Sequence, residues 1–397
     1  MPNGSTQHPL APVTEKKHIV GIDAIRLIAA ILVMFFHYGF WVGAYPQAAN
    51  AESVLISFPE LYDWTNFGWI GVQIFFVISG FVIAFSGERA SSAFHFLVTR
   101  VVRLVPAALI CATITLIITL ALQSSDASEL FIAYLRSIFF VPFGVYIDGS
   151  YWTLAIEIAF YALVFLLIAI GRFNRIKLLA IAIGLQSTIY WVLYVFATTH
   201  PAGELFQLMR ALQDSRSMEI LLLHHGCFFA IGIFLWAQLL KRPSRINLFW
   251  LAIFVGTGCL QIYGVTESFY YQFDIRQPTL TPMTVWLGSL LAIYMAVVYN
   301  HKIHEISPPW LLRMFRTMGL MTYPLYLLHQ TAGLALMNEL VKLGLNAYAA
   351  LLSIIVLAIA SAWLVSVFIE PPLQRLAKEY LLRLGSLGER KFAGQKL

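Results

Sequence analysis

Long apolar segments recur along the whole chain, and short polar stretches separate them. A run of about 20 apolar residues is long enough to cross the hydrocarbon core of a bilayer as a helix. Ten such segments are expected, at residues 19–42, 67–86, 101–122, 152–171, 178–198, 219–240, 247–264, 281–300, 319–340 and 347–369. The pattern therefore predicts an all-α membrane protein, built as a bundle of about ten transmembrane helices.

The composition agrees with this pattern and excludes a soluble globular protein. Hydrophobic residues make up 59% of the chain and charged residues 12%, with a mean hydropathy of +0.76. Soluble domains carry about 25% charged residues. We expect a short disordered cytoplasmic tail at residues 1–18, one transmembrane domain at 19–372 and a basic cytoplasmic tail at 373–397.

Lysine and arginine are unevenly distributed between the predicted loops. Most of the 26 residues of these two types lie on one set of loops, together with both ends of the chain. Positively charged loops stay in the cytoplasm, so both termini are predicted to be cytoplasmic. This bias accounts for the pI of 9.1 without a nucleic-acid partner. The three cysteines all lie within predicted spans and lack the spacing of a disulfide framework or a zinc site, so no metal is expected.

The first apolar segment, "GIDAIRLIAAILVMFFHYGFW", carries two ionisable residues, Arg26 and His37. Eleven residues of α-helix make three turns plus about 20°, which places both on one face, about 16 Å apart along the axis. Each residue alone also has a purely structural interpretation. Arg26 would pair with a phosphate or with Asp23, and His37 would form a hydrogen bond with another helix. Because ionisable residues inside a membrane are costly, the pair on one face favours a functional site.

Other polar residues interrupt later segments. Glu157 enters the membrane without a basic neighbour in sequence, so a histidine or arginine from another helix is expected as its partner. His329 follows Pro324, which can kink a helix and free backbone groups. His224 and His225 point about 100° apart on a helix, so only one of them is expected to face a shared site.

Two further groups lie at the predicted cytoplasmic side. Arg100 and Arg103, in "FLVTRVVRLVP", are three residues apart on one helical face, where they suit a polyanion. Anchoring by the positive-inside rule explains them equally well. Glu370 precedes two prolines at the end of the last segment, where it either caps the helix or pairs with the basic tail.

Six phrases in order resemble the acyltransferase 3 family of integral-membrane acyltransferases. They are "RLIAAILVMFFH", "GVQIFFVISGF", "FLVTRVVRLVP", "YWTLAIEIAFY", "YPLYLLH" and the terminal "IEPP", and they extend over nearly the whole chain. The resemblance implies a ten-helix bundle that transfers an acyl group, usually acetyl, from cytoplasmic acyl-CoA to a hydroxyl, typically on a sugar.

The resemblance also implies roles for single residues. His37 matches the essential histidine, and Arg26 matches the arginine paired with it. Arg100 and Arg103 match the RxxR pair associated with the acyl donor. Glu157, His329 and Glu370 fall in family motifs, and we assign Glu157 and His329 to the catalytic group with His37. One position departs from the family, because Gln73 stands where many members have aspartate.

These residues predict an O-acetyltransferase of the bacterial inner membrane that acts on a polysaccharide, a lipid-linked saccharide or a glycosylated small molecule. Arginine binds the phosphates of CoA in bidentate fashion, while His37 acts as general base or as transient acyl carrier. The same donor with a macrolide-like or amine acceptor stays open. A proton-coupled transporter would use Arg26, Glu157 and His329 as a pathway, but the inverted repeat typical of transporters is not visible in the sequence.

Overall fold

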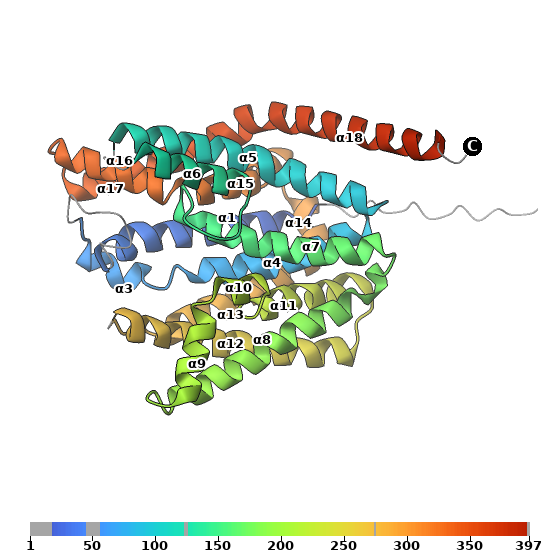
Figure 1. Cartoon of the computed structure of the whole chain (residues 1–397), viewed down its shortest axis with the longest axis horizontal. Helices are drawn as coiled ribbons and strands as arrows, with labels where there is room; N and C mark the ends of the chain where they lie inside the picture. Colours follow the sequence, from blue (N-terminus) through green and yellow to red (C-terminus); the bar gives the residue numbers. More distant parts are fainter. Residues whose placement is uncertain (1–17, 45–55, 123–125, 274, 395–397) are drawn as a thin grey trace, which may run out of the picture.

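The computed structural model describes residues 18–44, 56–122, 126–273 and 275–394. Within these ranges the chain forms helices joined by loops and contains no strand. The long helices run side by side along the long axis of the view (Figure 1). Eight of the described helices are long and apolar enough to cross a membrane, by length and composition. The predicted all-α, multi-pass membrane architecture is confirmed.

The long helices have the following bounds: α1 Val20–Phe35, α4 Ile70–Glu88, α5 Ala93–Leu122, α7 Trp152–Ala169, α8 Ile176–Thr198, α12 Arg245–Phe273, α13 Leu280–Val298, α15 Pro309–Leu328, α17 Ala347–Leu364 and α18 Glu370–Gly394. The shorter α-helices are α2 Val42–Ala44, α3 Tyr62–Thr65, α6 Ala127–Ile138, α9 Glu204–Gln213, α10 Arg216–Ile220, α11 Gly226–Trp236, α14 Asn300–Ile306 and α16 Thr331–Lys342. π-Helical turns occupy Phe36–Trp41, Ala237–Lys241 and Val365–Ile369, and 3-10 turns occupy Pro59–Leu61, Gly149–Tyr151 and Phe173–Arg175.

Two of the ten predicted spans are interrupted, and they are the two missing from the set of eight. The span expected at 219–240 consists of α10, a turn and α11, and the one expected at 319–340 breaks between α15 and α16. At this second break the Tyr38 hydroxyl donates to the His329 carbonyl at 2.5 Å, and the Thr331 amide donates to Asp148 at 2.7 Å. Non-helical backbone at membrane depth needs such partners inside the protein.

Helix α4 lies at the centre of the bundle, where it packs against α1, α7 and α11. Small residues allow its close approach to α11, a feature typical of membrane helix pairs. A Cβ atom on Gly80 would lie 2.2 Å from the carbonyl oxygen of Phe229, and one on Gly232 would lie 2.1 Å from that of Val77. The backbones of α4 and α11 are therefore in direct contact.

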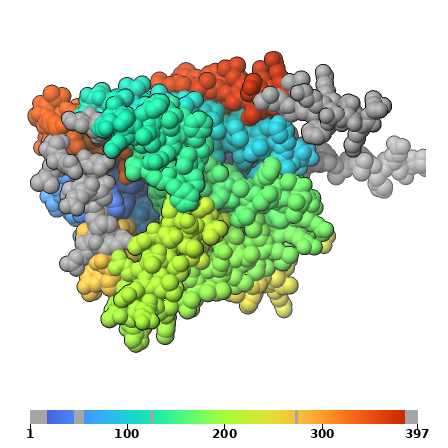
Figure 2. Space-filling model, in the orientation of Figure 1, coloured from blue at the N-terminus to red at the C-terminus, as the bar shows by residue number. Residues whose placement is uncertain are grey.

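The last helix, α18, follows α17 and packs against α5. It lies along one edge of the molecule, in red in Figure 2. The segment predicted as a basic tail at 373–397 is thus helical through Gly394. The tail predicted at residues 1–18 falls, except for His18, outside the described residues.

Candidate active site

Two cavities enter the bundle, and each holds part of the predicted site. The arginine cavity, of about 320 Å³, is lined by Arg26, Arg100 and Arg103, together with residues of α4, α7 and α15. The histidine cavity, of about 430 Å³, is lined by His37, four tryptophans and several glutamine side chains. Arg26 and His37, which the sequence places on one helix, therefore serve different cavities.

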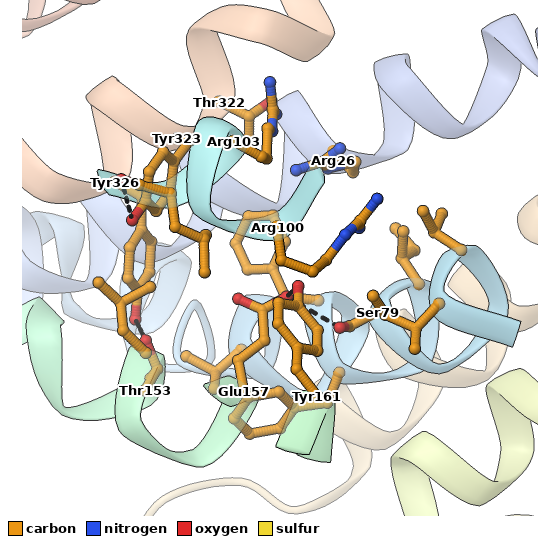
Figure 3. Close-up of a pocket in the computed structure, with 18 of the residues that line it drawn as sticks. Arg26, Ser79, Arg100, Arg103, Thr153, Glu157, Tyr161, Thr322, Tyr323 and Tyr326 are labelled. Carbon is orange, nitrogen blue, oxygen red and sulfur yellow. Dashed lines mark hydrogen bonds between the residues drawn. The ribbon is translucent and has the colours of Figure 1, made fainter. Parts of the chain in front are cut away.

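The arginine cavity gathers positive charge from two helices. Arg26 comes from α1, whereas Arg100 and Arg103 come from α5, and Figure 3 shows the three guanidinium groups together on one side of the cavity. Among the described residues no carboxylate lies within ion-pair distance of any of them. Three guanidinium groups without a carboxylate partner beside one cavity provide the chemistry that an anion binds.

Glu157 lies across this cavity from the arginines, beside Ser79 and Tyr161 (Figure 3). Its carboxylate accepts a hydrogen bond from the Tyr161 hydroxyl and another, at 2.8 Å, from the Ser79 hydroxyl. The prediction that a histidine or an arginine pairs with Glu157 is therefore wrong. Two neutral hydroxyl groups satisfy the carboxylate instead.

Asp23 does not pair with Arg26 either. Its carboxylate lies 2.5 Å from the Nε2 atom of His18, just before α1. The Arg26 guanidinium is left free to face the cavity, as its place in the lining shows.

The two predicted catalytic histidines meet at the histidine cavity, although 292 residues separate them. His37 Nδ1 lies 2.9 Å from His329 Nε2, and His329 Nδ1 lies 2.9 Å from the carbonyl oxygen of Tyr326. A carbonyl only accepts, so His329 Nδ1 carries a proton and, in the neutral pair, His329 Nε2 accepts from His37 Nδ1. In this series of hydrogen bonds the Nε2 atom of His37 carries no proton and is able to act as a base.

His37 lies at the start of the π-helical turn Phe36–Trp41, which follows α1. Such turns are frequent at functional sites because they change the direction in which side chains point. His37 lines the cavity, whereas His329 is fully buried behind it. His37 is therefore the member of the pair that faces the cavity.

Two residues that the sequence analysis did not select hold His329 in place. Tyr38 is fully buried and binds the His329 carbonyl, as described above. Asp148 is also fully buried and accepts from the Ser150 amide at 2.9 Å, in addition to the Thr331 amide. The aspartate before a helix start is a capping signal that was available in "YIDGSYW". No local signal marks Tyr38.

The two cavities are adjacent. Val72 of α4 and Tyr326 of α15 line both of them. The Tyr326 hydroxyl accepts a hydrogen bond from Thr153 at 3.1 Å, and its ring packs 5.6 Å from that of Phe75. These contacts fix Tyr326 at the boundary, so the arginine cavity and the histidine cavity are separated by two side chains.

His224 and His225 both line the histidine cavity, so the expectation that only one of them would face a shared site is wrong. The reason is that residues 221–225 form a turn between α10 and α11 and not a regular helix. Among the described residues, no group of three or more histidine, cysteine, aspartate or glutamate side chains is arranged to hold a metal ion.

Glu370 lies outside the lining of both cavities. It is buried at the start of α18 and accepts a hydrogen bond from Gln374 at 2.6 Å. The structure thus groups Arg26, Arg100, Arg103 and Glu157 in one cavity, pairs His37 with His329 at the other, and leaves Glu370 apart.

A comparison with protein families shows the family to which the chain belongs. The model of an acyltransferase domain family matches residues 19–369, nearly the whole chain. The chain belongs to this acyltransferase 3 family. No solved structure matches it.

Several relatives carry more specific names. A peptidoglycan O-acetyltransferase of Listeria monocytogenes is 24% identical over 79% of this chain and 49% of its own length. A putative peptidoglycan O-acetyltransferase of Bacillus subtilis is 25% identical over 79% of this chain and 48% of its own length. An O-acetyl transferase of Shigella phage Sf6 is 33% identical over 23% of this chain and 24% of its own length. The chain thus matches about half the length of the first two relatives.

Proposed function

We propose that this protein is a membrane O-acetyltransferase that transfers an acetyl group from acyl-CoA to a hydroxyl of a carbohydrate. The observation that carries the proposal is the pair of adjacent cavities, one with three arginines that lack a carboxylate partner and one with His37, whose Nδ1 atom lies 2.9 Å from His329 Nε2. The names of the relatives support a carbohydrate, and peptidoglycan in particular, as the acceptor.

The arginine cavity suits the donor. CoA carries several phosphate groups, and arginine binds phosphate oxygens through two parallel hydrogen bonds. A CoA molecule held by Arg26, Arg100 and Arg103 would direct its thioester toward Val72 and Tyr326, the boundary with the histidine cavity.

The positions of the lining residues support opposite sides for the two substrates. Arg26 is near the start of α1, Ser79 is in the second half of α4, and Arg100 is near the start of α5, all toward the loops rich in lysine and arginine. The histidine cavity is lined by Val33, near the end of α1, and by Gln73, in the first turn of α4. By the positive-inside rule, the donor enters from the cytoplasm and the acceptor from the outer side of a bacterial inner membrane.

His37 performs the transfer in this proposal. Its Nε2 atom removes the proton from the acceptor hydroxyl, whose oxygen attacks the thioester carbonyl. The carbon–sulfur bond then breaks, and the CoA thiolate takes up the proton from His37. In the second route, Nε2 itself attacks the thioester carbonyl, and the carbon–sulfur bond breaks to release the CoA thiolate. The acceptor oxygen then takes the acyl group from Nε2, and the proton of its hydroxyl passes to the thiolate. Both routes release one free thiol for each acyl group transferred.

Acetyl-CoA turnover by the purified protein in detergent tests the proposal. The release of the CoA thiol is measured for the wild type and for His37→Ala, with peptidoglycan fragments as acceptor. The loss of a general base predicts a rate about 10²–10⁴-fold lower. His301→Ala, at an exposed histidine of α14, is the matched control and keeps the wild-type rate. A folded wild type that neither binds nor consumes acetyl-CoA contradicts the proposal and favours the alternative of a proton-coupled transporter.

A further inference from the structure

Part of the histidine cavity is lined by buried polar atoms that have no partner among the described residues. They are Oε1 of Gln73, Nε2 of His224, Nδ1 of His225 and both amide atoms of Gln261. All four residues line the cavity, and none is more than 6% exposed. A buried polar group without a hydrogen bond costs about 1–3 kcal/mol, so five such atoms around one cavity indicate a ligand that binds them.

These residues come from three segments that pack together. Gln73 lies on α4, His225 immediately precedes α11, and Gln261 lies on α12; α11 contacts both of the other helices. The His225 ring is 5.1 Å from the ring of Phe76 and 5.8 Å from that of Trp152. The polar atoms therefore belong to ordered walls of the bundle and not to an exposed loop.

The chemistry of the lining selects the class of ligand. The carboxamide of Gln261 offers donors and an acceptor side by side, Gln73 offers an acceptor, and neutral His225 offers either one according to its tautomer. The same cavity includes the carboxylate of Asp214 and that of Glu219, whose charge the Arg216 guanidinium balances at 2.5 Å. No arginine or lysine is among its lining residues, so the described lining offers no permanent cation to an anion.

Aromatic side chains complete the lining. Four tryptophans, Trp41, Trp69, Trp152 and Trp191, face the cavity and provide flat apolar surfaces. A sugar ring has apolar faces and a rim of hydroxyl or acetamido groups that both donate and accept. An uncharged sugar therefore matches this combination of amides and indole rings, and a phosphate or a carboxylate does not.

We propose that Gln73, His225 and Gln261 form a recognition subsite for an uncharged sugar unit of the acceptor. The inference rests on the proposed function and adds the residues that select the acceptor. These side chains bind and orient the sugar, while His37 acts on its hydroxyl. A site built to bind hydroxyl and amide groups rejects ligands that lack them, because its own buried groups are then left unpaired.

The test compares two kinetic constants in one variant. Gln261→Leu removes the carboxamide, and KM is measured for acetyl-CoA and for a probe acceptor, an oligomer of N-acetylglucosamine. The loss of about two hydrogen bonds predicts a KM for the oligomer about tenfold higher, with a much smaller change in KM for acetyl-CoA. Gln207→Leu, the same change at an exposed position on α9, leaves both constants at the wild-type value.

Further measurements distinguish an error in the proposed subsite from an error in the proposed function. Gln261→Asn keeps the amide chemistry and is expected to retain more of the oligomer affinity than Gln261→Leu, which a purely structural role does not predict. An unchanged KM for the oligomer in Gln261→Leu, or faster transfer to an anionic oligogalacturonate than to the neutral oligomer, overturns the subsite. Consumption of acetyl-CoA by the wild type without transfer to either saccharide also overturns it, yet leaves the donor site intact. Failure to consume acetyl-CoA at all contradicts the proposed function itself.

Discussion

The two cavities differ most in charge. The arginine cavity holds three guanidinium groups and one carboxylate that two hydroxyls satisfy. The histidine cavity combines histidines, glutamines and tryptophans with the carboxylates of Asp214 and Glu219, and Arg216 pairs with Glu219. Among the described residues, only Val72 and Tyr326 line both cavities. One bundle thus offers adjacent environments for an anionic substrate and for an uncharged one.

This difference in charge gives a reason why each substrate would bind in a different cavity. Unpaired cations inside a membrane protein are costly, and an anionic ligand offsets that cost. In our proposal the phosphates of CoA bind beside the arginines, because the lining of the histidine cavity contains no arginine or lysine. Only the acyl end of the donor is then expected to pass Val72 and Tyr326 and reach His37.

The largest expected effect concerns His329 and separates catalysis from donor binding. His329→Phe removes the acceptor that fixes the proton of His37 on Nδ1. We expect kcat to fall by about 10² or more, the range of a general-base contribution, while KM for acetyl-CoA changes little. His301→Phe serves as the matched control. A rise in KM for acetyl-CoA with unchanged kcat would assign His329 to the donor site instead.

The next effect concerns the opposite cavity. Arg100→Gln removes one charged partner of the donor, and hydrogen bonds to charged groups contribute about 1.5–3 kcal/mol. KM for acetyl-CoA is expected to rise by about 10–100-fold, with a smaller change in KM for the acceptor. Arg313→Gln, at an exposed arginine of α15, controls for the loss of positive charge. Equal effects on both substrates would show that the cavities do not divide them.

A smaller effect is expected at the boundary between the cavities. Val72→Ala enlarges the passage for the acyl group, so the ratio of kcat/KM for butyryl-CoA to that for acetyl-CoA should rise about tenfold, since one methylene in an apolar pocket changes discrimination by about 10–200-fold. Val82→Ala lines only the arginine cavity and Val265→Ala only the histidine cavity. If either control changes the ratio as much as Val72→Ala, the boundary does not select the acyl chain.

The smallest expected effect is the response to salt. Charged partners bind less tightly as the Debye length falls from about 10 Å at 0.1 M to about 3 Å at 1 M salt. KM for acetyl-CoA should therefore rise with salt concentration, whereas KM for an uncharged oligosaccharide should stay nearly constant. Equal changes in KM for acetyl-CoA and in KM for the oligosaccharide would contradict the claim that the two cavities bind substrates of different charge.

Sequence reasoning predicted the features that local patterns control. Apolar length predicted the helical membrane architecture, and the spacing of Arg100 and Arg103 predicted that both lie on one helical face, where both line the arginine cavity. Each of these depends on residues that are near one another in the chain.

Features that depend on distant contacts were not predictable in the same way. The break after His329 is stabilised by Tyr38 and Asp148, which lie far away in the sequence. The partners of Glu157 are hydroxyl groups, one of them from another helix, because neutral donors satisfy a carboxylate as well as a cation does. His224 and His225 face one cavity because a turn replaces the helix that hydropathy predicts.

The most direct test of the account is a cryo-electron microscopy structure of the protein with a non-hydrolysable thioether analogue of acetyl-CoA. The account predicts density for the phosphates beside Arg26, Arg100 and Arg103, with the acyl end directed between Val72 and Tyr326 toward His37. Phosphate density in the histidine cavity, or outside both cavities, would contradict the assignment of the donor site.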